Sequence, residues 1–103
     1  MRAALLPTPG DPFLLAYWLR NYEQVWADEV DQLLVLVNGQ NDPAILTYFA
    51  QRLAQVPHAS FLTLPNRMDH GRALNILYDA TDADRLLFCE DDALVREPGA
   101  IRA

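Results

Sequence analysis

Three consecutive acidic residues, Glu90, Asp91 and Asp92, have the clearest chemical potential in the sequence. They follow the expected strand Arg85–Cys89, which is apolar from Leu86 onward and delivers three carboxylates to its end. Adjacent like charges repel, and holding them together costs stability unless a cation or hydrogen-bond donors compensate. Mg²⁺ and Mn²⁺ take one or two carboxylates and complete their shell with phosphate and water. The trio therefore indicates a divalent-metal site or, equally well, an acidic loop facing solvent.

A second set of candidate ligand-binding residues lies in the segment PNRMDHGRALN, residues 65–75. Arg67 and Arg72 offer forked donors that suit phosphate, although each taken singly is more often a surface arginine. Gly71 permits close backbone approach, and Asn75 can donate from the first turns of the expected helix. Helix N-termini also attract phosphate. The segment predicts a phosphate-binding loop.

The histidines and the cysteine carry weaker signals. His58 and His70 have no second His or Cys at metal-ligand spacing, so we interpret both as exposed loop residues. Cys89 is the single cysteine and follows Leu87 and Phe88, which favours a buried small side chain over a nucleophile.

Alternating strands and helices must position these residues. Short apolar runs predict the strands, and Asp-Pro pairs predict two helix starts because Asp accepts from first-turn amides and Pro needs no donor there. The strands are expected at Ala3–Leu6, Leu33–Val37, Ser60–Leu64 and Arg85–Cys89, and the helices from Asp11-Pro12 to about residue 26, from Asp42-Pro43 with Ile45, Phe49 and Leu53 inward, and over Gly71–Ala80.

This alternation predicts a Rossmann-like α/β fold with three layers, α/β/α, around a mostly parallel sheet. In such a sheet, ligands bind outside the carboxyl ends of the strands. The polar residues that follow the strands are Thr8, Asn38–Asp42, Asn66–Arg72 and Glu90–Asp92. We therefore expect one crevice that gathers all four loops.

Size and charge exclude several classes of protein. The chain has 103 residues and a mass of 11.7 kDa, which predicts a single domain over residues 1–103. A net charge of −6 argues against a nucleic-acid partner. No apolar run approaches the roughly 18 residues of a membrane span, and the first residues lack a signal-peptide pattern, so we expect a cytoplasmic protein. Glu97–Ile101 looks like the opening of a further helix, which suggests a truncated chain or, alternatively, a natural frayed tail.

Four motifs, in order, resemble the nucleotide-sugar-binding half of family 2 glycosyltransferases, which have the GT-A fold. Residues 4–8, ALLPT, are similar to the family's opening strand and Pro-Thr turn, and residues 37–42, VNGQND, to its VDNGSTD loop. Gly71, Ala73 and Asn75 are similar to its G…A…N pattern, and residues 86–101, LLFCEDDALVREPGAI, to its LLFLDDDVLVEPGAL segment. The resemblance covers essentially the whole chain.

The resemblance implies an inverting transfer of a sugar from a nucleoside diphosphate, most often UDP, to a hydroxyl of an unknown acceptor, with Mn²⁺ or Mg²⁺ stabilising the leaving diphosphate. By position, Asp92 and Glu90 of a DXD-like motif would hold the metal, and Asp91 would lie near the ribose. The other residues implied to bind the nucleotide sugar are Pro7, Thr8, Asn38, Asp42, Arg67, Gly71, Arg72 and Asn75.

Two residues depart from the family pattern. Val37 stands where the family usually has an Asp that contacts the base, and Glu90 replaces the usual first Asp of the acidic motif. The family's general base is expected beyond Ala103, so no catalytic base is named, and this polypeptide alone is expected to bind donor weakly without turnover.

Two other functions remain open from the sequence. A non-catalytic nucleotide-binding or interaction module could keep the same fold, and residues 86–97 are also similar to the opening strand and acidic pocket of a phosphorelay receiver domain. We also expect self-association, because a half-domain would expose a sheet edge and helix faces.

Overall fold

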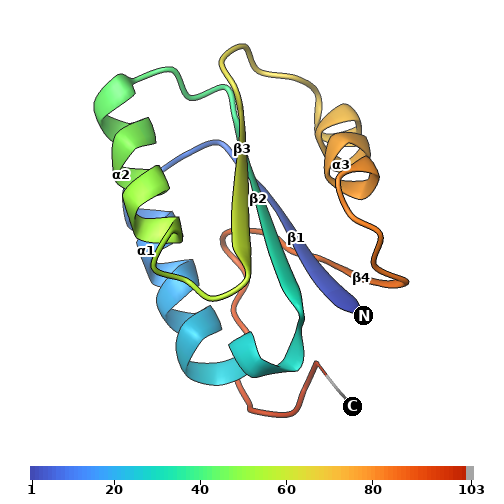
Figure 1. The fold of residues 1–103 in the computed structure, drawn as a ribbon. Helices are drawn as coiled ribbons and strands as arrows, with labels where there is room; N and C mark the ends of the chain where they lie inside the picture. Colours follow the sequence, from blue (N-terminus) through green and yellow to red (C-terminus); the bar gives the residue numbers. More distant parts are fainter. Residues whose placement is uncertain (102–103) are drawn as a thin grey trace.

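The computed structural model describes residues 1–101, which form a four-stranded sheet with helices on both faces (Figure 1). In chain order, the elements are β1 (Arg2–Thr8), α1 (Pro12–Asn21), the π-helix η1 (Tyr22–Trp26), the 3₁₀-helix η2 (Ala27–Glu29), β2 (Gln32–Asn38), α2 (Pro43–Leu53), β3 (Ala59–Leu64), α3 (His70–Asp79) and β4 (Arg85–Phe88). The expected Rossmann-like α/β fold is confirmed.

All pairs in the sheet are parallel, in the order β3-β2-β1-β4. From β1 the chain moves outward to β2 and β3, and then returns through α3 to place β4 on the other side of β1. The direction of winding therefore reverses between β1 and β4. In open parallel sheets, the crevice at such a reversal, outside the carboxyl ends of the strands, is the usual ligand site.

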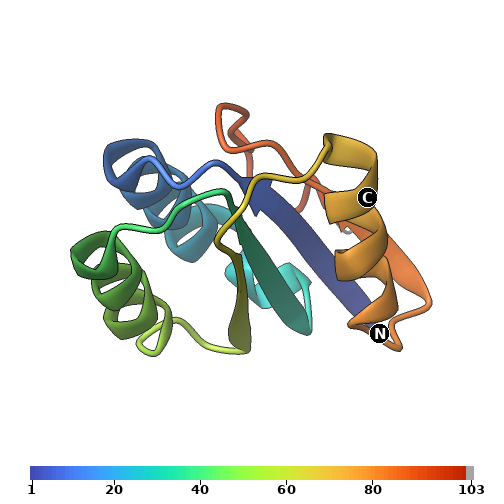
Figure 2. The ribbon, with the colours of Figure 1, turned by 90° about the horizontal axis from the view of Figure 1, so that it is seen from above.

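The two faces of the sheet have separate cores. Helices α1 and α2 cover one face and α3 covers the other, as the view along the sheet shows (Figure 2). Side chains alternate along β1, so Ala4 and Leu6 pack toward α1 and α2, while Ala3 and Leu5 pack toward α3. β1 and β2 are buried on both faces, which explains their continuous apolar runs.

Both predicted Asp-Pro helix starts are confirmed. Asp11 accepts hydrogen bonds from the amides of Phe13 and Leu14 at 2.9 and 3.2 Å, and Asp42 accepts from Ala44 at 2.9 Å. The other boundaries shift by one or two residues: the first two strands and the third strand are longer than expected, α3 begins at His70, and β4 ends before Cys89.

The first helix extends to residue 26 as expected, but it is an α-helix only as far as Asn21. It then widens into η1, which keeps Tyr22 and Trp26 in the core. The expectation of a further helix at residues 97–101 was wrong. Residues 97–101 form a turn and no helix: Gly99 has a φ of +88°, in the left-handed region, and its amide donates to Glu29 Oε2 at 3.0 Å. Arg102 and Ala103 lie outside the described residues.

Candidate functional site

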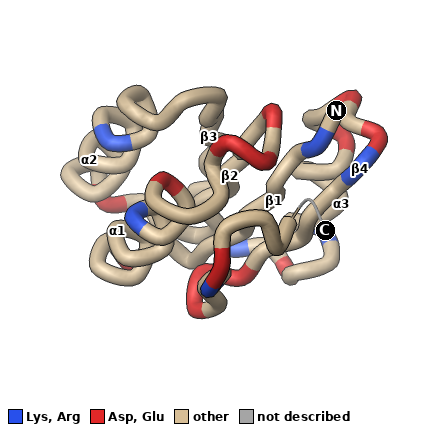
Figure 3. The backbone as a smooth tube through the Cα atoms, turned by 90° about the horizontal axis from the view of Figure 1, so that it is seen from below, with Lys and Arg blue, Asp and Glu red and all other residues tan. Residues whose placement is uncertain are grey.

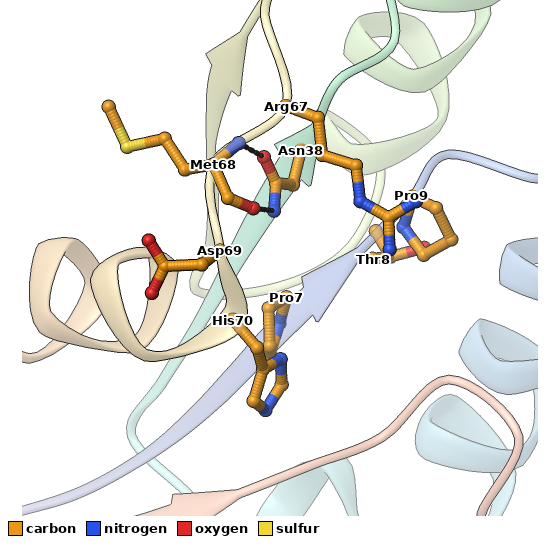
Figure 4. Close-up of a pocket in the computed structure, with 8 residues that line it drawn as sticks. All are labelled: Pro7, Thr8, Pro9, Asn38, Arg67, Met68, Asp69 and His70. Carbon is orange, nitrogen blue, oxygen red and sulfur yellow. Dashed lines mark hydrogen bonds between the residues drawn. The ribbon is translucent and has the colours of Figure 1, made fainter.

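A cavity of about 120 Å³ lies at the carboxyl ends of β1 and β2. Its walls come from the ends of these strands and from the loop between β3 and α3 (Figure 4). The lining residues are Pro7, Thr8, Pro9, Asn38, Arg67, Met68, Asp69 and His70. Four of the residues predicted from the sequence, Pro7, Thr8, Asn38 and Arg67, are thus brought together, because parallel strands end at the same edge of the sheet.

Asn38 fixes the loop that follows β3. Its Nδ2 donates to the carbonyl of Met68 at 2.9 Å, and its Oδ1 accepts from the Met68 amide at 2.9 Å (Figure 4). Both ends of the side-chain amide are therefore engaged by backbone. Asn38 shapes the cavity by holding Met68 and its neighbours in place.

Two glycines allow the loops after β1, β2 and β3 to pack against one another. Gly10 and Gly39 have φ values of +94° and +91°, which side chains rarely tolerate. A Cβ at Gly10 would lie 2.9 Å from Gln40 Cβ, and a Cβ at Gly39 would lie 2.9 Å from Arg67 Cβ. Gln40 also donates from Nε2 to the carbonyl of Gly10 at 3.2 Å. Arg67 is consequently seated directly on the turn after β2.

Thr8 joins the cavity to the chain after β4, residues 90–95, which we call the acidic segment. It is 1% exposed, its hydroxyl donates to Asp91 Oδ2 at 2.8 Å, and its Oγ1 accepts from the Gly10 amide at 3.2 Å. The Cys89 amide, just before the acids, donates to the carbonyl of Leu5 at 2.8 Å and extends the pairing of β4 with β1. The acidic segment therefore starts at the reversal point of the sheet.

The carboxylates of Glu90 and Asp92 are exposed and, within residues 1–101, engage no cationic or donor side chain. Over the same residues, no three His, Cys, Asp or Glu side chains are arranged to hold a metal ion. Free carboxylate oxygens in a short turn nevertheless suit Mg²⁺ or Mn²⁺, which need only one or two of them when phosphate supplies the other ligands. These residues therefore fit a divalent ion that is bound together with a diphosphate.

The remaining predicted residues lie outside the cavity. Gly71, Arg72 and Asn75 line a second hollow of about 530 Å³ between α3 and Phe88 of β4. Arg72 forms an ion pair with Asp69, at 3.4 Å between Nε and Oδ1. Asp42 caps α2 through Oδ1. Asp92 is exposed and, among the described residues, does not line either space.

Four lining residues were missed from the sequence: Pro9, Met68, Asp69 and His70. Asp69 caps α3 by accepting from the Arg72 amide at 3.3 Å. An Asp just before an expected helix is a local signal for such a cap. His70 is exposed, as expected, but it begins α3 instead of lying in a loop. Met68 lines the cavity only because Asn38 holds its backbone, which no local pattern reveals.

Val37 does not face the cavity. It is fully buried in the core that β1 and β2 share with α1 and α2. Val37 therefore completes the core and offers no carboxylate at the position where the resemblance implies an Asp.

Cys89 lies beneath the acidic segment and is half-buried, packed against the core that contains Tyr22. Burial raises the pKa of the Cys89 thiol from 9.0 to about 12. The pKa of Tyr22 is also raised to about 12, mainly by burial and to a smaller extent by electrostatic interaction with Cys89 and Glu23. A thiol held neutral in this way is a poor nucleophile, in agreement with the structural interpretation of Cys89.

Charges are interspersed over the surface, with basic positions next to acidic ones (Figure 3). Arg67 and His70 are the basic side chains in the wall of the cavity. None of the helices described in residues 1–101 is both long and apolar enough to cross a membrane.

The sequence matches neither a family profile nor a curated protein. The structure is similar to that of a mannosyltransferase, PcManGT from Pyrobaculum calidifontis, which was solved in complex with GDP-Man and Mn²⁺. The TM-score is 0.76 at 17% identity, and the match covers 95% of this chain but 29% of the mannosyltransferase. The chain thus spans less than a third of that protein. The likeness shows that the chain shares its α/β fold with this part of the mannosyltransferase.

Proposed function

We propose that this chain is the donor-binding part of an inverting glycosyltransferase of family 2 that takes a nucleoside-diphosphate sugar. The observation that carries the proposal is the hydrogen bond between Thr8 and Asp91, which joins a small polar cavity to an acidic segment at the reversal point of the sheet. The fold of a mannosyltransferase that binds GDP-Man and Mn²⁺ supports it.

In the proposed complex, the cavity receives the nucleoside side of the donor and Arg67 faces the diphosphate. The guanidinium of Arg67 has no ion-pair partner among residues 1–101 and is free to pair with phosphate. Arg72 is committed to Asp69, so we assign the diphosphate contact to Arg67. Gly71 and Asn75 would contact the donor from the first turns of α3, and Asp42 would border the nucleoside through Oδ2, which capping does not use.

Asp92 and Glu90 would hold Mn²⁺ or Mg²⁺, and Asp91 would lie near the ribose. The bound cation would offset the negative charge that builds on the leaving diphosphate. Thr8 keeps one carboxylate of the trio turned toward β1, which leaves the other two free to bind. The proposed base is uracil, as the family resemblance implies. Transfer to the acceptor requires a general base that we assign to a part of the protein after residue 103.

Calorimetric titration of the purified chain with UDP and GDP, each with and without Mn²⁺, tests the proposal. We expect binding that is strengthened by Mn²⁺ and favours UDP, and we expect Asp92→Asn to abolish the strengthening by the metal. Asp82→Asn is the matched control, because Asp82 is also an exposed carboxylate and lies before β4. Equal Mn²⁺ dependence in the wild type and Asp92→Asn, or no nucleotide binding at all, contradicts the proposal.

A further inference from the structure

The C-terminal end of α1 has an unusual side-chain arrangement around Asn21. After Asn21 the helix widens into η1, and the Ala27 amide donates to the carbonyl five residues earlier, that of Tyr22. The wider turn also brings Trp26 back over Asn21, where its Nε1 donates to Asn21 Oδ1 at 3.2 Å. Single π-turns of this kind cost helix regularity and frequently occur at functional sites.

The same side chain binds the segment that follows the acids. Asn21 Nδ2 donates to the carbonyl of Val95 at 2.7 Å, and Asn21 Oδ1 accepts from the Val95 amide at 3.0 Å. The indole N–H of Trp26 can only donate, so it fixes which end of the Asn21 amide is the oxygen. The π-turn therefore orients the Asn21 side chain so that it hydrogen-bonds to the backbone of Val95, 74 residues away in sequence.

The hydrogen bonds between Asn21 and Val95 are one of three attachments that hold the acidic segment. Cys89 is held by the carbonyl of Leu5, Asp91 by Thr8, and Val95 by Asn21, so both ends and one acid are tied to β1 and α1. Figure 2 shows the chain after β4 crossing the end of β1 toward α1. Between these attachments, the free carboxylates of Glu90 and Asp92 repel one another and Asp91. Fixed ends oppose the spreading that this repulsion favours.

We propose that Asn21 is a positioning residue, which acts through Val95 to hold the acidic segment in the conformation that receives a divalent cation and a diphosphate. The inference rests on the proposed function and adds to it a residue outside the cavity and outside the acidic motif. A residue that orients a metal ligand raises metal affinity without touching the metal. Without it, the ligand must be ordered when the ion binds, which costs binding free energy.

Asn21→Asp tests the inference with the smallest change in shape. The variant keeps the oxygen that accepts from Trp26 and Val95, but it replaces the donor with a second oxygen that faces the Val95 carbonyl. Gln24→Glu adds the same charge at an exposed position of η1 and is the matched control. Asn21→Ala, which removes the hydrogen bonds to Val95 without adding charge, is the second variant. Urea unfolding checks that each variant folds.

Two measurements decide the outcome. In the metal-free protein, we expect hydrogen exchange of the Val95 amide to become faster in both Asn21 variants and to remain unchanged in Gln24→Glu, while amides of β1 keep their protection. In UDP titrations, we expect the Mn²⁺ concentration needed for half-maximal strengthening to rise about tenfold in the Asn21 variants. UDP affinity without metal should stay as in the wild type, which a general loss of structure would not produce.

The failures of the two proposals differ. If the wild type binds UDP with a clear Mn²⁺ dependence and folded Asn21 variants show the same dependence, the positioning role is overturned and the donor-binding function stands. An unchanged Val95 exchange rate also overturns it. If the wild type binds no nucleotide, with or without Mn²⁺, the donor-binding function is overturned and the positioning role falls with it.

Discussion

Two glycines near the cavity have different physical roles. Gly39 adopts a φ of +91°, and a Cβ there would lie 2.9 Å from Arg67 Cβ and 3.3 Å from Arg67 Cα. Gly71 lies in the first turn of α3, and the nearest atom to its Cβ would be Asp69 Oδ2, at an ordinary 3.5 Å. Only Gly39 is therefore required by the fold, whereas Gly71 leaves room for a ligand.

We accordingly expect opposite effects from the same substitution at these two positions. Gly39→Ala should lower the free energy of unfolding by about 1–3 kcal/mol, because it forces a side chain into the left-handed region and against Arg67. Gly71→Ala should raise it by about 0.5–1 kcal/mol, because alanine has less backbone freedom to lose in a helix. Urea unfolding measures both, and a loss of stability at Gly71 as large as that at Gly39 contradicts this account.

At the residue scale, the sequence predicted some of the side chains that meet at the cavity, but not how they are engaged. Thr8, Asn38 and Arg67 converge because the ends of parallel strands share one edge, a consequence of topology alone. The hydrogen bonds between the Asn38 side chain and the Met68 backbone depend on the path of the loop between β3 and α3. Asn21 carries no local signal, since its partner Val95 lies 74 residues away. Pairings of this kind emerge only from the tertiary structure.

At the scale of elements, starts of helices were predictable and the end of α1 was not. An Asp before a Pro caps a helix by accepting hydrogen bonds from the amides two and three residues later, which is a local interaction. The turn at η1 instead depends on three aromatic rings that pack together: Tyr22 stacks on Trp18 with centroids 5.7 Å apart and meets Trp26 edge-on at 4.8 Å. The three rings lie on the helical face that the sequence predicts, but no local pattern indicates that their packing is accompanied by a wider π-turn.

We expect the fold to become less stable at alkaline pH because of two groups in the packing between η1 and the end of β4. Tyr22 and Cys89 both have a pKa of about 12, against 10.0 and 9.0 for the unperturbed groups. Between these values the unfolded chain loses protons that the folded chain keeps, so the stability that is present below about pH 9 falls as the pH rises toward 12. Urea unfolding at pH 7 and pH 11 measures this loss.

Tyr22→Phe isolates the contribution of the tyrosine. The Tyr22 hydroxyl is buried and has no hydrogen-bond partner within residues 1–101, so its removal should raise stability at pH 7 by up to about 1 kcal/mol and should reduce the loss at pH 11. Tyr17→Phe, on the exposed side of α1, is the control and should change neither value. A pH dependence that is the same in Tyr22→Phe and the wild type contradicts the assignment.

At the scale of the whole molecule, the parallel sheet and its two helical layers followed from the alternation of strand and helix patterns. The strand order β3-β2-β1-β4 leaves β3 and β4 as edges among the described residues. The two edges differ in their surroundings, because α3 covers only part of its face and leaves Phe88 of β4 and Tyr78 of α3 more than half exposed. Unpaired backbone groups beside exposed aromatic rings favour pairing with another chain.

We therefore expect the 103-residue chain to self-associate through β4. Phe88→Lys should weaken this association, because it removes apolar surface at the edge and places like charges opposite each other in a pair of edges. Phe13→Lys is a strict control: Phe13 on α1 is 84% exposed, against 53% for Phe88, so general stickiness of aromatic surface would make Phe13 the more sensitive position. Sedimentation velocity over a range of concentrations distinguishes the two. A wild type that sediments as a monomer at every concentration, or equal effects of both substitutions, contradicts association through β4, because only an edge-specific contact depends on which aromatic residue is replaced.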